Sequence, residues 1–439
     1  MQCRELAWID PGTAFQALAG QGPLVFLDSA ATGDPRAQIS YIGIDPRATL
    51  RLDNATPLPA WLETAKPEDN TAPPDWPFPF KGGAMGWLGY DAGLAPLGLS
   101  SRHPPFPTLP AGWFGMFDLV LGFDHAARRC FALAAARPAD NAGARLMALA
   151  ARLAPPAASF PPIPPLQWVE TLPRHIYEAQ VERLRAYIAA GDVYQANFTA
   201  CFTAPRPPGF NPASFHAALR ARSPAPFAAF IDTGTGMALC SASPERFLSL
   251  DTTGRVETRP IKGTAPRAAS PAEDQANAAA LRANPKERAE NLMITDLLRN
   301  DLGQVCATGS VQVPELFAVE SYAQAHHLVS AVTGRLRAGL GAADLLFSCF
   351  PGGSITGAPK YRAMQIIDEL EETPRGAYCG SIAWIGLDGA MDSSIVIRTL
   401  VATPETLYAQ AGGGITWDSV PSAEYEEMML KLSPLIAHG

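Results

Sequence analysis

The stretch Thr258-Arg259-Pro260-Ile261-Lys262-Gly263-Thr264 is the part of the sequence around which the remaining motifs are arranged. Residues 255 to 257 follow the Gly254 turn and have the composition of a short strand. Proline has no backbone N–H to donate to a ladder, so we expect strand pairing to stop at Pro260. Lys262 then lies where a strand gives way to a loop, a common position for a functional side chain. The heptapeptide alone favours an ordinary surface lysine, and only the downstream motifs reverse that preference.

The composition is that of a globular protein with a large core. Of the 439 residues, 47% are hydrophobic and 17% are charged, which excludes a disordered or fibrous chain. The formal net charge of −8 and the absence of a lysine or arginine run argue against nucleic acid as a partner. The N-terminal residues do not resemble a signal peptide, and no apolar run approaches membrane-spanning length. We therefore expect a cytoplasmic protein that does not bind membranes.

The cysteines give no sign of a metal or disulfide framework. There are seven of them, which is an odd number; they lie far apart, and none forms a C-x-x-C pair. Isolated cysteines in an acidic globular chain are typical of small buried side chains in a reducing compartment.

Strand and helix signals divide the chain into two segments joined by a proline-rich connector. Residues 1–150 contain short strand-like runs and end in a helix expected over 139–153. The glycine-dense run 82–91 lacks the spacing of a dinucleotide fingerprint and indicates close backbone packing between strands. Residues 151–170 form the stiff connector, and residues 171–439 form a second domain.

The second segment reads as antiparallel strands alternating with helices. We expect helices over 175–190, 271–300 and 361–370, and a terminal helix from Ser422. Four short strands fall between residues 227 and 258, and further strands over 381–387, 393–401 and 406–411. The pattern predicts an α+β fold in which two antiparallel sheets pack as a sandwich with helices outside.

The strand expected from Tyr194 to Thr203 alternates apolar and polar residues. Its polar face carries Gln195, Asn197 and Thr199. The pattern fits a strand that presents Gln195 to a cavity and fits equally well a strand whose polar face meets solvent.

Two pairs of carboxylates share the same helical spacing. Glu287 and Glu290 follow the Asn284-Pro285 start of one helix, and Glu424 and Glu427 follow Ser422 in another, with Lys431 one turn further on that face. Each pair by itself is an ordinary solvated or dipole-compensating first turn. If both pairs faced one cavity, they would make an oxygen-rich site suited to Mg²⁺.

Two glycine-rich stretches could bring backbone groups to a ligand. The run from Gly352 to Lys360 is not a phosphate loop, because Ala358-Pro359 interrupts the required Gly-Lys-Ser/Thr, yet it precedes a helix and could hold an anion. The triplet Gly412 to Gly414 allows a close backbone approach, although alone it is better explained as a bulge or tight turn.

A histidine pair, a glutamate and an arginine could also carry chemistry. His326 and His327 are neighbours on a strand, so they face opposite ways and one of them is structural. Glu245 stands at a turn between strands, and an inward-pointing Arg398 would bind a carboxylate bidentately.

Taken together, these segments resemble the chorismate-utilising enzymes, and among them the aminodeoxychorismate synthases. The resemblance follows one order along nearly all of residues 170 to 435. The matching segments are Gly191 to Gln195, Ser243 to Phe247, Arg259 to Thr264, Arg288 to Met293, His326 to Ser330, Pro351 to Lys360, Ile397 to Thr399 and Ala411 to Gly414.

The resemblance implies a Mg²⁺-dependent reaction on chorismate, which is a dianion. Glu290 and Glu427 match metal ligands, and Glu287 and Glu424 are nearby carboxylates that hold water or complete the shell. The positions that match carboxylate-binding groups are Thr356, Arg398, Gly412, Gly413, Gly414 and Lys431. His327 matches the family's active-site histidine, and Tyr378 lies beside the same pocket.

Two positions separate the relatives. Isochorismate and salicylate synthases carry a lysine base where Gln195 stands here, and anthranilate synthases carry an alanine at the position of Lys262. A lysine there resembles the aminodeoxychorismate type, in which the lysine attacks C2 while Glu245 protonates the departing C4 hydroxyl, and ammonia then displaces the lysine. The expected product is 4-amino-4-deoxychorismate, a precursor of p-aminobenzoate and folate.

This role places a demand on Lys262. A free lysine has a pKa of about 10.4 and is cationic at neutral pH, so the side chain must be desolvated or crowded by positive charge. Arg259 and the Mg²⁺ are the sources of charge that the sequence suggests.

The resemblance also implies partners. Ammonia comes from a separate glutamine amidotransferase subunit, so we expect a heterodimer. Phe26-Leu27-Asp28-Ser29 resembles a segment of the tryptophan pocket of anthranilate synthase, and the sequence leaves open whether tryptophan binds.

Two other functions stay open. An anthranilate synthase large subunit is disfavoured by Lys262. A catalytically silent subunit that binds tryptophan for regulation has no need of Lys262, Glu245 and four glutamates.

Overall fold

The structure is a computed structural model that describes residues 1–31, 33–52, 57–68, 71–154, 159–322, 325–437. Residues 155–158 of the expected connector therefore lie outside the described residues. Among the described residues, no helix is both long and apolar enough to cross a membrane.

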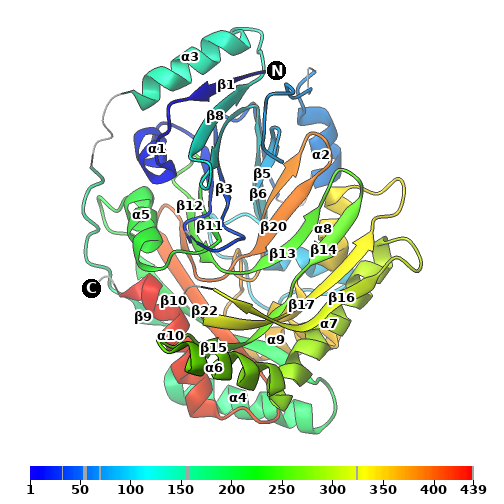
Figure 1. Cartoon of the computed structure of the whole chain (residues 1–439). Helices are drawn as coiled ribbons and strands as arrows, with labels where there is room; N and C mark the ends of the chain where they lie inside the picture. Colours follow the sequence, from blue (N-terminus) through cyan, green and yellow to red (C-terminus); the bar gives the residue numbers. More distant parts are fainter. Residues whose placement is uncertain (32, 53–56, 69–70, 155–158, 323–324, 438–439) are drawn as a thin grey trace.

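Two antiparallel sheets form the centre of the molecule (Figure 1). The first sheet runs in the order β1-β8-β7-β3-β2-β11-β12-β21-β22-β10-β18, with β9 also paired to β10. Its strands are β1 (Gln2–Leu6), β8 (Arg129–Ala134), β7 (Leu119–Asp124), β3 (Ile39–Ile44), β2 (Leu24–Asp28), β11 (Phe227–Asp232), β12 (Ala238–Ser243), β21 (Thr399–Ala402), β22 (Thr406–Ile415), β10 (Gln195–Pro205), β18 (Gly357–Ala358) and β9 (Val169–Glu170).

The second sheet runs in the order β15-β17-β14-β13-β20-β19-β5-β6-β4, with β16 also paired to β17. Its strands are β15 (Ile261–Pro266), β17 (Ala325–Arg335), β14 (Arg255–Thr258), β13 (Arg246–Leu250), β20 (Met391–Ile395), β19 (Ser381–Gly386), β5 (Gly83–Leu88), β6 (Gly112–Phe117), β4 (Ala48–Arg51) and β16 (Gln312–Ser321).

Helices cover the outer faces of both sheets, as Figure 1 shows. Those against the first sheet are α1 (Pro11–Leu18), α3 (Ala142–Leu153), α4 (Arg174–Ala189), α5 (Pro212–Arg222), α9 (Lys360–Leu370) and α10 (Pro421–Ile436). Those against the second sheet are α2 (Leu58–Ala65), α6 (Pro271–Ala283), α7 (Pro285–Val305) and α8 (Ala342–Cys349). Short 3₁₀ turns are η1 (Tyr90–Gly93), η2 (Ala95–Leu97) and η3 (Gly353–Ile355).

The buried residues form three layers that explain this arrangement. One core fills the space between the first sheet and its helices, and a second lies between the second sheet and α2, α7 and α8. A third core, which includes Trp87 and Phe117, fills the space between the two sheets. Each sheet therefore buries both of its faces, and the predicted α+β sandwich with helices outside is confirmed.

The first segment of the chain shares its sheets with the second segment. Strands β1, β2, β3, β7 and β8 from residues 1–150 continue into β11 of the second segment through the β2–β11 pair. In the second sheet, β5 pairs with β19 in the same way. Both sheets are thus built from both ends of the sequence.

The glycine-dense run 82–91 packs as the sequence predicts. A Cβ on Gly86 of β5 would lie 2.0 Å from the carbonyl oxygen of Trp113 in β6, and one on Gly83 would lie 2.2 Å from that of Ile385 in β19. Side chains at these positions would separate β5 from its two neighbours.

Three expectations about individual helices and strands are wrong. Lys262 lies within β15 and not in a loop, because the chain resumes pairing with β17 after Pro260. The register slips between Ile261 and Thr264, so the lysine stands in an irregular part of the strand.

The strand expected over 393–401 is two strands. β20 ends at Ile395 in the second sheet, and β21 begins at Thr399 in the first sheet. Arg398 has a φ of 50° at this crossing between sheets, so its direction does not follow from strand alternation. The helix expected over 271–300 is likewise divided at Asn284, which caps α7.

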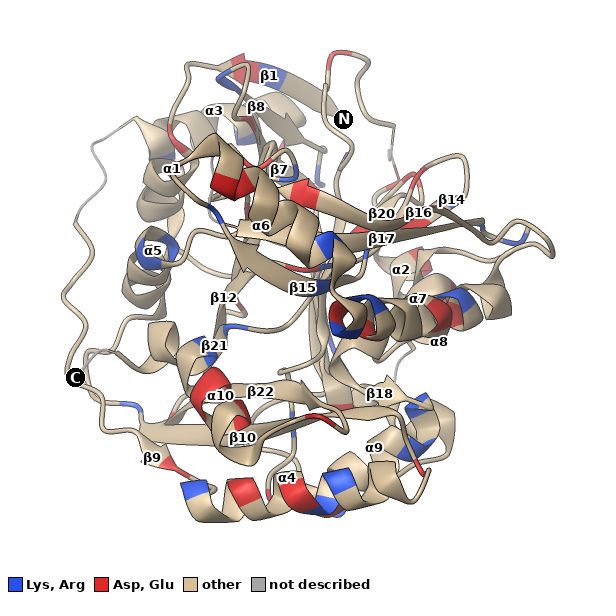
Figure 2. Cartoon of the chain, turned by 60° about the horizontal axis from the view of Figure 1, so that its bottom comes forward, with Lys and Arg blue, Asp and Glu red and all other residues tan. Residues whose placement is uncertain are grey.

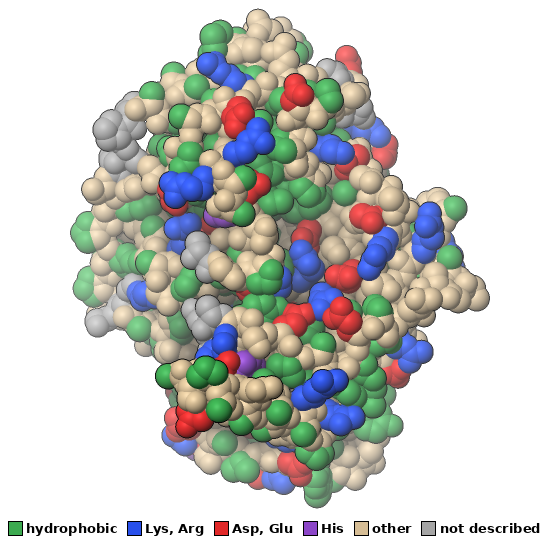
Figure 3. All heavy atoms as spheres, in the orientation of Figure 1, with side chains coloured by type: hydrophobic (Ala, Val, Ile, Leu, Met, Phe, Trp, Pro, Cys, Tyr) green, Lys and Arg blue, Asp and Glu red, His purple; other side chains and the backbone are tan. Residues whose placement is uncertain are grey.

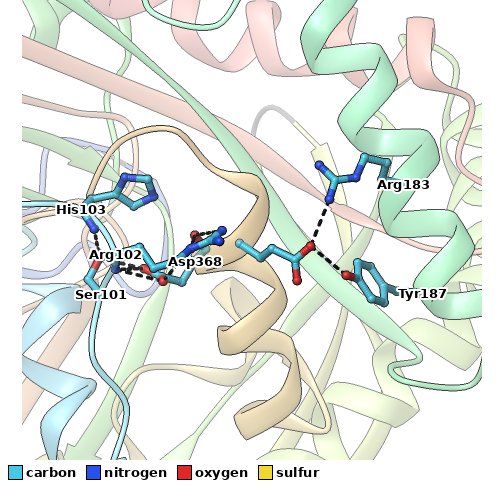
Figure 4. A network of polar contacts seen from close by, with 7 residues as sticks. Ser101, Arg102, His103, Arg183, Tyr187 and Asp368 are labelled. Atoms are coloured by element: carbon cyan, nitrogen blue, oxygen red, sulfur yellow. Dashed lines mark hydrogen bonds and ion pairs between the residues drawn. The ribbon is translucent and has the colours of Figure 1, made fainter.

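A polar network fixes α9 from both sides (Figure 4). Asp368 accepts hydrogen bonds from the hydroxyl of Ser101 and the backbone N–H of Arg102. The neighbouring Glu369 accepts from Arg183 at 3.0 Å and from the Tyr187 hydroxyl at 2.8 Å, both on α4. The helix that follows the glycine-rich loop at 352–358 is thereby held in place.

Candidate active site

A cavity of about 960 Å³ brings together residues from both halves of the second segment. This volume is at the upper end of the range typical of small-molecule sites. Its walls come from β15, β22, α7 and α10, from the turn before β13 and from the crossing that carries Arg398. Figure 2 shows the charged residues of α7 and α10 in the part of the molecule where β15 and β22 also lie.

Lys262 and Glu245 both line this cavity. The Glu245 carboxyl is only partly accessible, and burial raises its pKa, although Ser354, Lys262, Lys431 and Arg398 each oppose that rise. A carboxyl group with a raised pKa can carry a proton at a higher pH than an ordinary glutamate. Among the described residues, Lys262 has no ion-pair partner within 4.0 Å.

Arg259 is not the neighbour that the sequence suggests for Lys262. Its guanidinium forms an ion pair with Glu315 at 2.7 Å and another with Glu320. Its positive charge is therefore compensated locally, and we expect it to contribute little to the state of Lys262.

The two carboxylate pairs face the same cavity, which the sequence alone could not show. Glu287 and Glu290 come from the first turns of α7, and Glu424 and Glu427 from the first turns of α10. Burial raises the pKa of Glu290, and the charges of Glu287 and Glu424 add to that rise.

The arrangement of these glutamates fits Mg²⁺ in its donor chemistry. Within the described ranges, no three His, Cys, Asp or Glu side chains are already grouped as a metal site. Mg²⁺ commonly takes only one or two carboxylates and completes its octahedron with water and substrate oxygens. Burial also raises the pKa of Glu424, and Glu427 adds to the effect, so a nearby cation would stabilise the ionised pair.

Arg398 and His327 add positive and neutral donors to the cavity wall. The Arg398 side chain is solvent-accessible within the cavity, where desolvation lowers its pKa, and no carboxylate of the described residues forms an ion pair with it. Burial lowers the pKa of His327, and Arg36 and Arg398 lower it further, so the ring is neutral near pH 7. Its Nδ1 lies 3.0 Å from the Thr264 hydroxyl.

His326 is the structural member of the histidine pair, as strand alternation predicts. It is 2% exposed, and its ring nitrogens contact Ser321 at 2.7 Å and Asp274 at 3.0 Å. Its neighbour His327 faces the cavity.

The glycine triplet lies within the β22 ladder and forms neither a bulge nor a turn. Gly412, Gly413 and Gly414 pair with Thr199, Phe198 and Asn197 of β10. A Cβ on Gly413 would lie 3.1 Å from Glu424 Oε2, and one on Gly414 would lie 2.5 Å from Gln195 Nε2 and 3.4 Å from Lys262 Nζ. The glycines therefore keep this wall of the cavity open.

Gln195 and Thr356 stand just behind the cavity wall. Gln195 is fully buried, and both of its amide atoms lack a hydrogen-bond partner among the described residues. Thr356 is also fully buried and donates its hydroxyl to the Gly352 carbonyl at 2.9 Å. The polar face of β10 thus points inward, and its Asn197 reaches the cavity. Tyr378 lines the cavity directly.

The cavity wall also contains residues that the sequence did not point to, and Lys286, Ser354 and Arg36 are among them. Lys286 precedes Glu287 in the first turn of α7, a position that could have been noted. Ser354 lies in the glycine-rich loop and is hydrogen-bonded to Glu245. Arg36 comes from the first segment, and no sequence motif around it indicates a functional role. It forms an ion pair with Asp34 at 2.7 Å, and its guanidinium lies 4.1 Å from the centre of the Tyr322 ring.

A second, smaller cavity of about 330 Å³ lies beside the segment Leu27 to Ser29. It is lined by aromatic residues such as Tyr41 and Trp384 and by the Arg246–Asp392 ion pair at 2.9 Å. Arg36 and Pro226 line both cavities, so the two spaces are neighbours.

The surface carries mixed charges, and most of the cysteines are buried. Figure 3 shows lysine and arginine side chains next to acidic ones across one face of the molecule. All seven cysteines are free, and six of them are buried.

Comparison with known proteins identifies the family. Residues 23–437 match the chorismate binding enzymes. Aminodeoxychorismate synthase component 1 of Klebsiella aerogenes is 48% identical over 82% of this chain and 77% of its own length, and that of Salmonella typhimurium is 41% identical over 94% and 88%. The crystal structure of anthranilate synthase component I from Streptococcus pneumoniae superposes with a TM-score of 0.77 at 32% identity and covers 90% of this chain and 91% of that one. The chain belongs to the chorismate binding enzyme family.

Proposed function

We propose that this enzyme aminates chorismate to 4-amino-4-deoxychorismate with ammonia, in the biosynthesis of p-aminobenzoate and folate. The observation that carries the proposal is that Lys262 and Glu245, a nucleophile and an acid, line one cavity together with Arg398. The similarity to aminodeoxychorismate synthase component 1 over most of the chain supports the same reaction.

Lys262 supplies the nucleophile in this reaction. In its neutral form the amine attacks C2 of chorismate, the ring double bonds shift, and the C4–O bond breaks while Glu245 donates its proton, so that water leaves. Ammonia then attacks C4, the double bonds shift back, and the C2–N bond to Lys262 breaks. The sum is chorismate plus ammonia giving the amino product plus water.

The other cavity residues bind and orient the dianion. Arg398 is a fork of donors suited to one carboxylate, and the glycine wall of β22 allows the ring to approach the backbone. The neutral His327 can donate a hydrogen bond without adding charge. Gln195, behind Gly414, would order a small polar molecule, since a glutamine cannot act as a general base toward water.

Mg²⁺ would be held by Glu290 and Glu427, with Glu287 and Glu424 binding water or completing the shell. When bound, the ion supplies charge stabilisation for the substrate carboxylate and for the departing hydroxyl. The support is the convergence of both carboxylate pairs on the cavity.

Ammonia is expected from a glutamine amidotransferase partner. The relatives are named component 1, which implies a second component. Tryptophan is the proposed occupant of the smaller cavity, which borders the Phe26-Leu27-Asp28-Ser29 segment and has aromatic walls.

A product assay tests the proposal. The purified chain is incubated with chorismate, Mg²⁺ and ammonium at mildly alkaline pH, and products are separated and identified by mass. We expect an amino-deoxychorismate that yields p-aminobenzoate when a lyase is added. Anthranilate as the main product would instead establish the second candidate, which the anthranilate synthase component I structure favours. Tight tryptophan binding without any turnover would establish a regulatory subunit.

A further inference from the structure

Lys431 makes contacts that conflict with its expected role. Its Nζ lies 2.6 Å from Glu427 Oε1 and donates a hydrogen bond to the Gly412 carbonyl at 3.0 Å. The two residues stand four positions apart on α10, so the pair forms along one face of the helix. In the proposed function, Glu427 binds a cation and Lys431 binds a substrate carboxylate. In this structure, however, the two side chains are bound to each other.

The intact pair weakens both roles. A carboxylate oxygen in contact with an ammonium has less charge to offer a divalent cation, and the ammonium and the cation repel each other. Moving the ammonium away from Glu427 therefore makes that carboxylate a stronger ligand.

The surroundings allow Lys431 to move. Its side chain is about one-third exposed, and the amine is carried at the end of a flexible four-carbon chain. The neighbouring Gly413 has no side chain, and a Cβ there would lie 3.8 Å from Nζ and 3.1 Å from Glu424 Oε2. The glycine wall leaves room for the amine to swing from the glutamate toward the cavity.

We propose that Lys431 is a placeholder for the metal ion: it neutralises Glu427 in the metal-free chain, is displaced when a divalent cation binds, and is thereby released to bind a carboxylate of the substrate. This inference rests on the proposed function, because it takes the cation and the dianionic substrate from there. The freed ammonium and the cation repel each other until the dianion neutralises both. Metal and substrate therefore strengthen each other's binding, and the coupling is reciprocal.

A second lysine in the same cavity provides the matched control. Lys286 carries the same charge and also lies near a proposed ligand, but its Nζ is 4.0 Å from Glu290 and its side chain is about half exposed. Replacing it removes a charge from the cavity without breaking a short contact.

The first test measures metal binding without turnover. Mn²⁺ is titrated into the purified chain without chorismate and followed by electron paramagnetic resonance. We expect Lys431→Met to bind Mn²⁺ about tenfold more tightly than the wild type, whereas Lys286→Met changes the affinity by about threefold or less.

The second test measures the coupling. Glu245→Gln is expected to bind chorismate without converting it, so chorismate affinity is measured by calorimetry in this background with and without Mg²⁺. We expect Mg²⁺ to tighten chorismate binding, and the factor to be several-fold smaller when Lys431→Met is added, because the released amine no longer contributes.

The outcomes separate this inference from the proposed function. If the wild type binds Mn²⁺ but Lys431→Met binds it equally or more weakly, or if the coupling factor is unchanged, the placeholder role is wrong while metal dependence stands. If the wild type binds no Mn²⁺ with or without chorismate, the proposed metal dependence fails, and the placeholder role fails with it.

Discussion

The two neighbouring cavities differ in how their charges are paired. Beside the smaller cavity, Arg246 and Asp392 form an ion pair at 2.9 Å, and Asp28 is bound by Arg220 at 2.6 Å. The larger cavity also contains close pairs, such as Lys431 with Glu427 at 2.6 Å, but its Lys262 and Arg398 have no carboxylate within ion-pair distance among the described residues.

The ion pairs beside the smaller cavity stabilise the fold, whereas Lys262 and Arg398 remain available to bind a ligand. A cation without a neighbouring carboxylate gains no ion-pair stabilisation from the fold, and its charge is available to bind an anionic ligand. The larger cavity is accordingly the candidate active site, whereas the charged residues beside the smaller cavity already form ion pairs with one another.

The largest effect is expected from Lys262→Ala. Removing the nucleophile should lower the rate of aminodeoxychorismate formation by about 10³-fold or more, since the covalent route is lost. Product formation is followed by chromatography with saturating chorismate and ammonium. Lys81→Ala is the matched control, because Lys81 is paired with Asp388 and lines neither cavity. A variant at position 262 with the wild-type rate would refute the covalent role.

Glu245→Gln should lower kcat by about 10²- to 10⁴-fold, because the amide cannot protonate the leaving hydroxyl. Chorismate binding should be kept, since the amide fills the same space. Rate and calorimetric affinity measured on the same preparation check this, and full activity would exclude Glu245 as the proton donor.

Arg398→Met should raise the KM for chorismate by about 10- to 100-fold, which corresponds to the loss of about 1.4–2.8 kcal/mol from a charged hydrogen-bonded contact. The free energy of unfolding should change little, because the side chain makes no ion pair among the described residues. Steady-state kinetics and urea denaturation measure the two quantities. An unchanged KM would show that the unpaired arginine serves another purpose.

The pH dependence of kcat should reflect Glu245. Activity needs its protonated form and falls as the pH rises through its pKa, which burial places above that of an ordinary glutamate. Ser354 opposes the rise by hydrogen bonding to the carboxyl, so Ser354→Ala should move the alkaline limb to higher pH. The pH profile of kcat at saturating substrate shows the direction, and a shift to lower pH would contradict this assignment.

The smallest effect on catalysis is expected from the smaller cavity. Arg246→Met breaks a partly buried ion pair and should lower the free energy of unfolding by about 1–2 kcal/mol while kcat stays near the wild-type value. Denaturation and initial rates are measured in parallel. A large loss of kcat without a loss of stability would erase the distinction between the two cavities.

Much of the local structure follows from the sequence. The spacing of Glu424, Glu427 and Lys431 placed them on one face of α10, because residues three, four and seven apart are neighbours on a helix. Strand alternation likewise separated His326 from His327. The ordered motifs also identified the family, since they report chemistry that a relative must keep.

Only the tertiary structure decided which distant residues meet. The two carboxylate pairs converge because α7 packs on one sheet and α10 on the other, and Arg36 reaches the cavity from a strand connection more than 200 residues from Glu245. Arg398 takes its direction from the crossing between sheets, which strand periodicity cannot describe. Local pattern encodes contacts within a turn or a strand, whereas the order of strands in the two sheets sets every contact across the cavity.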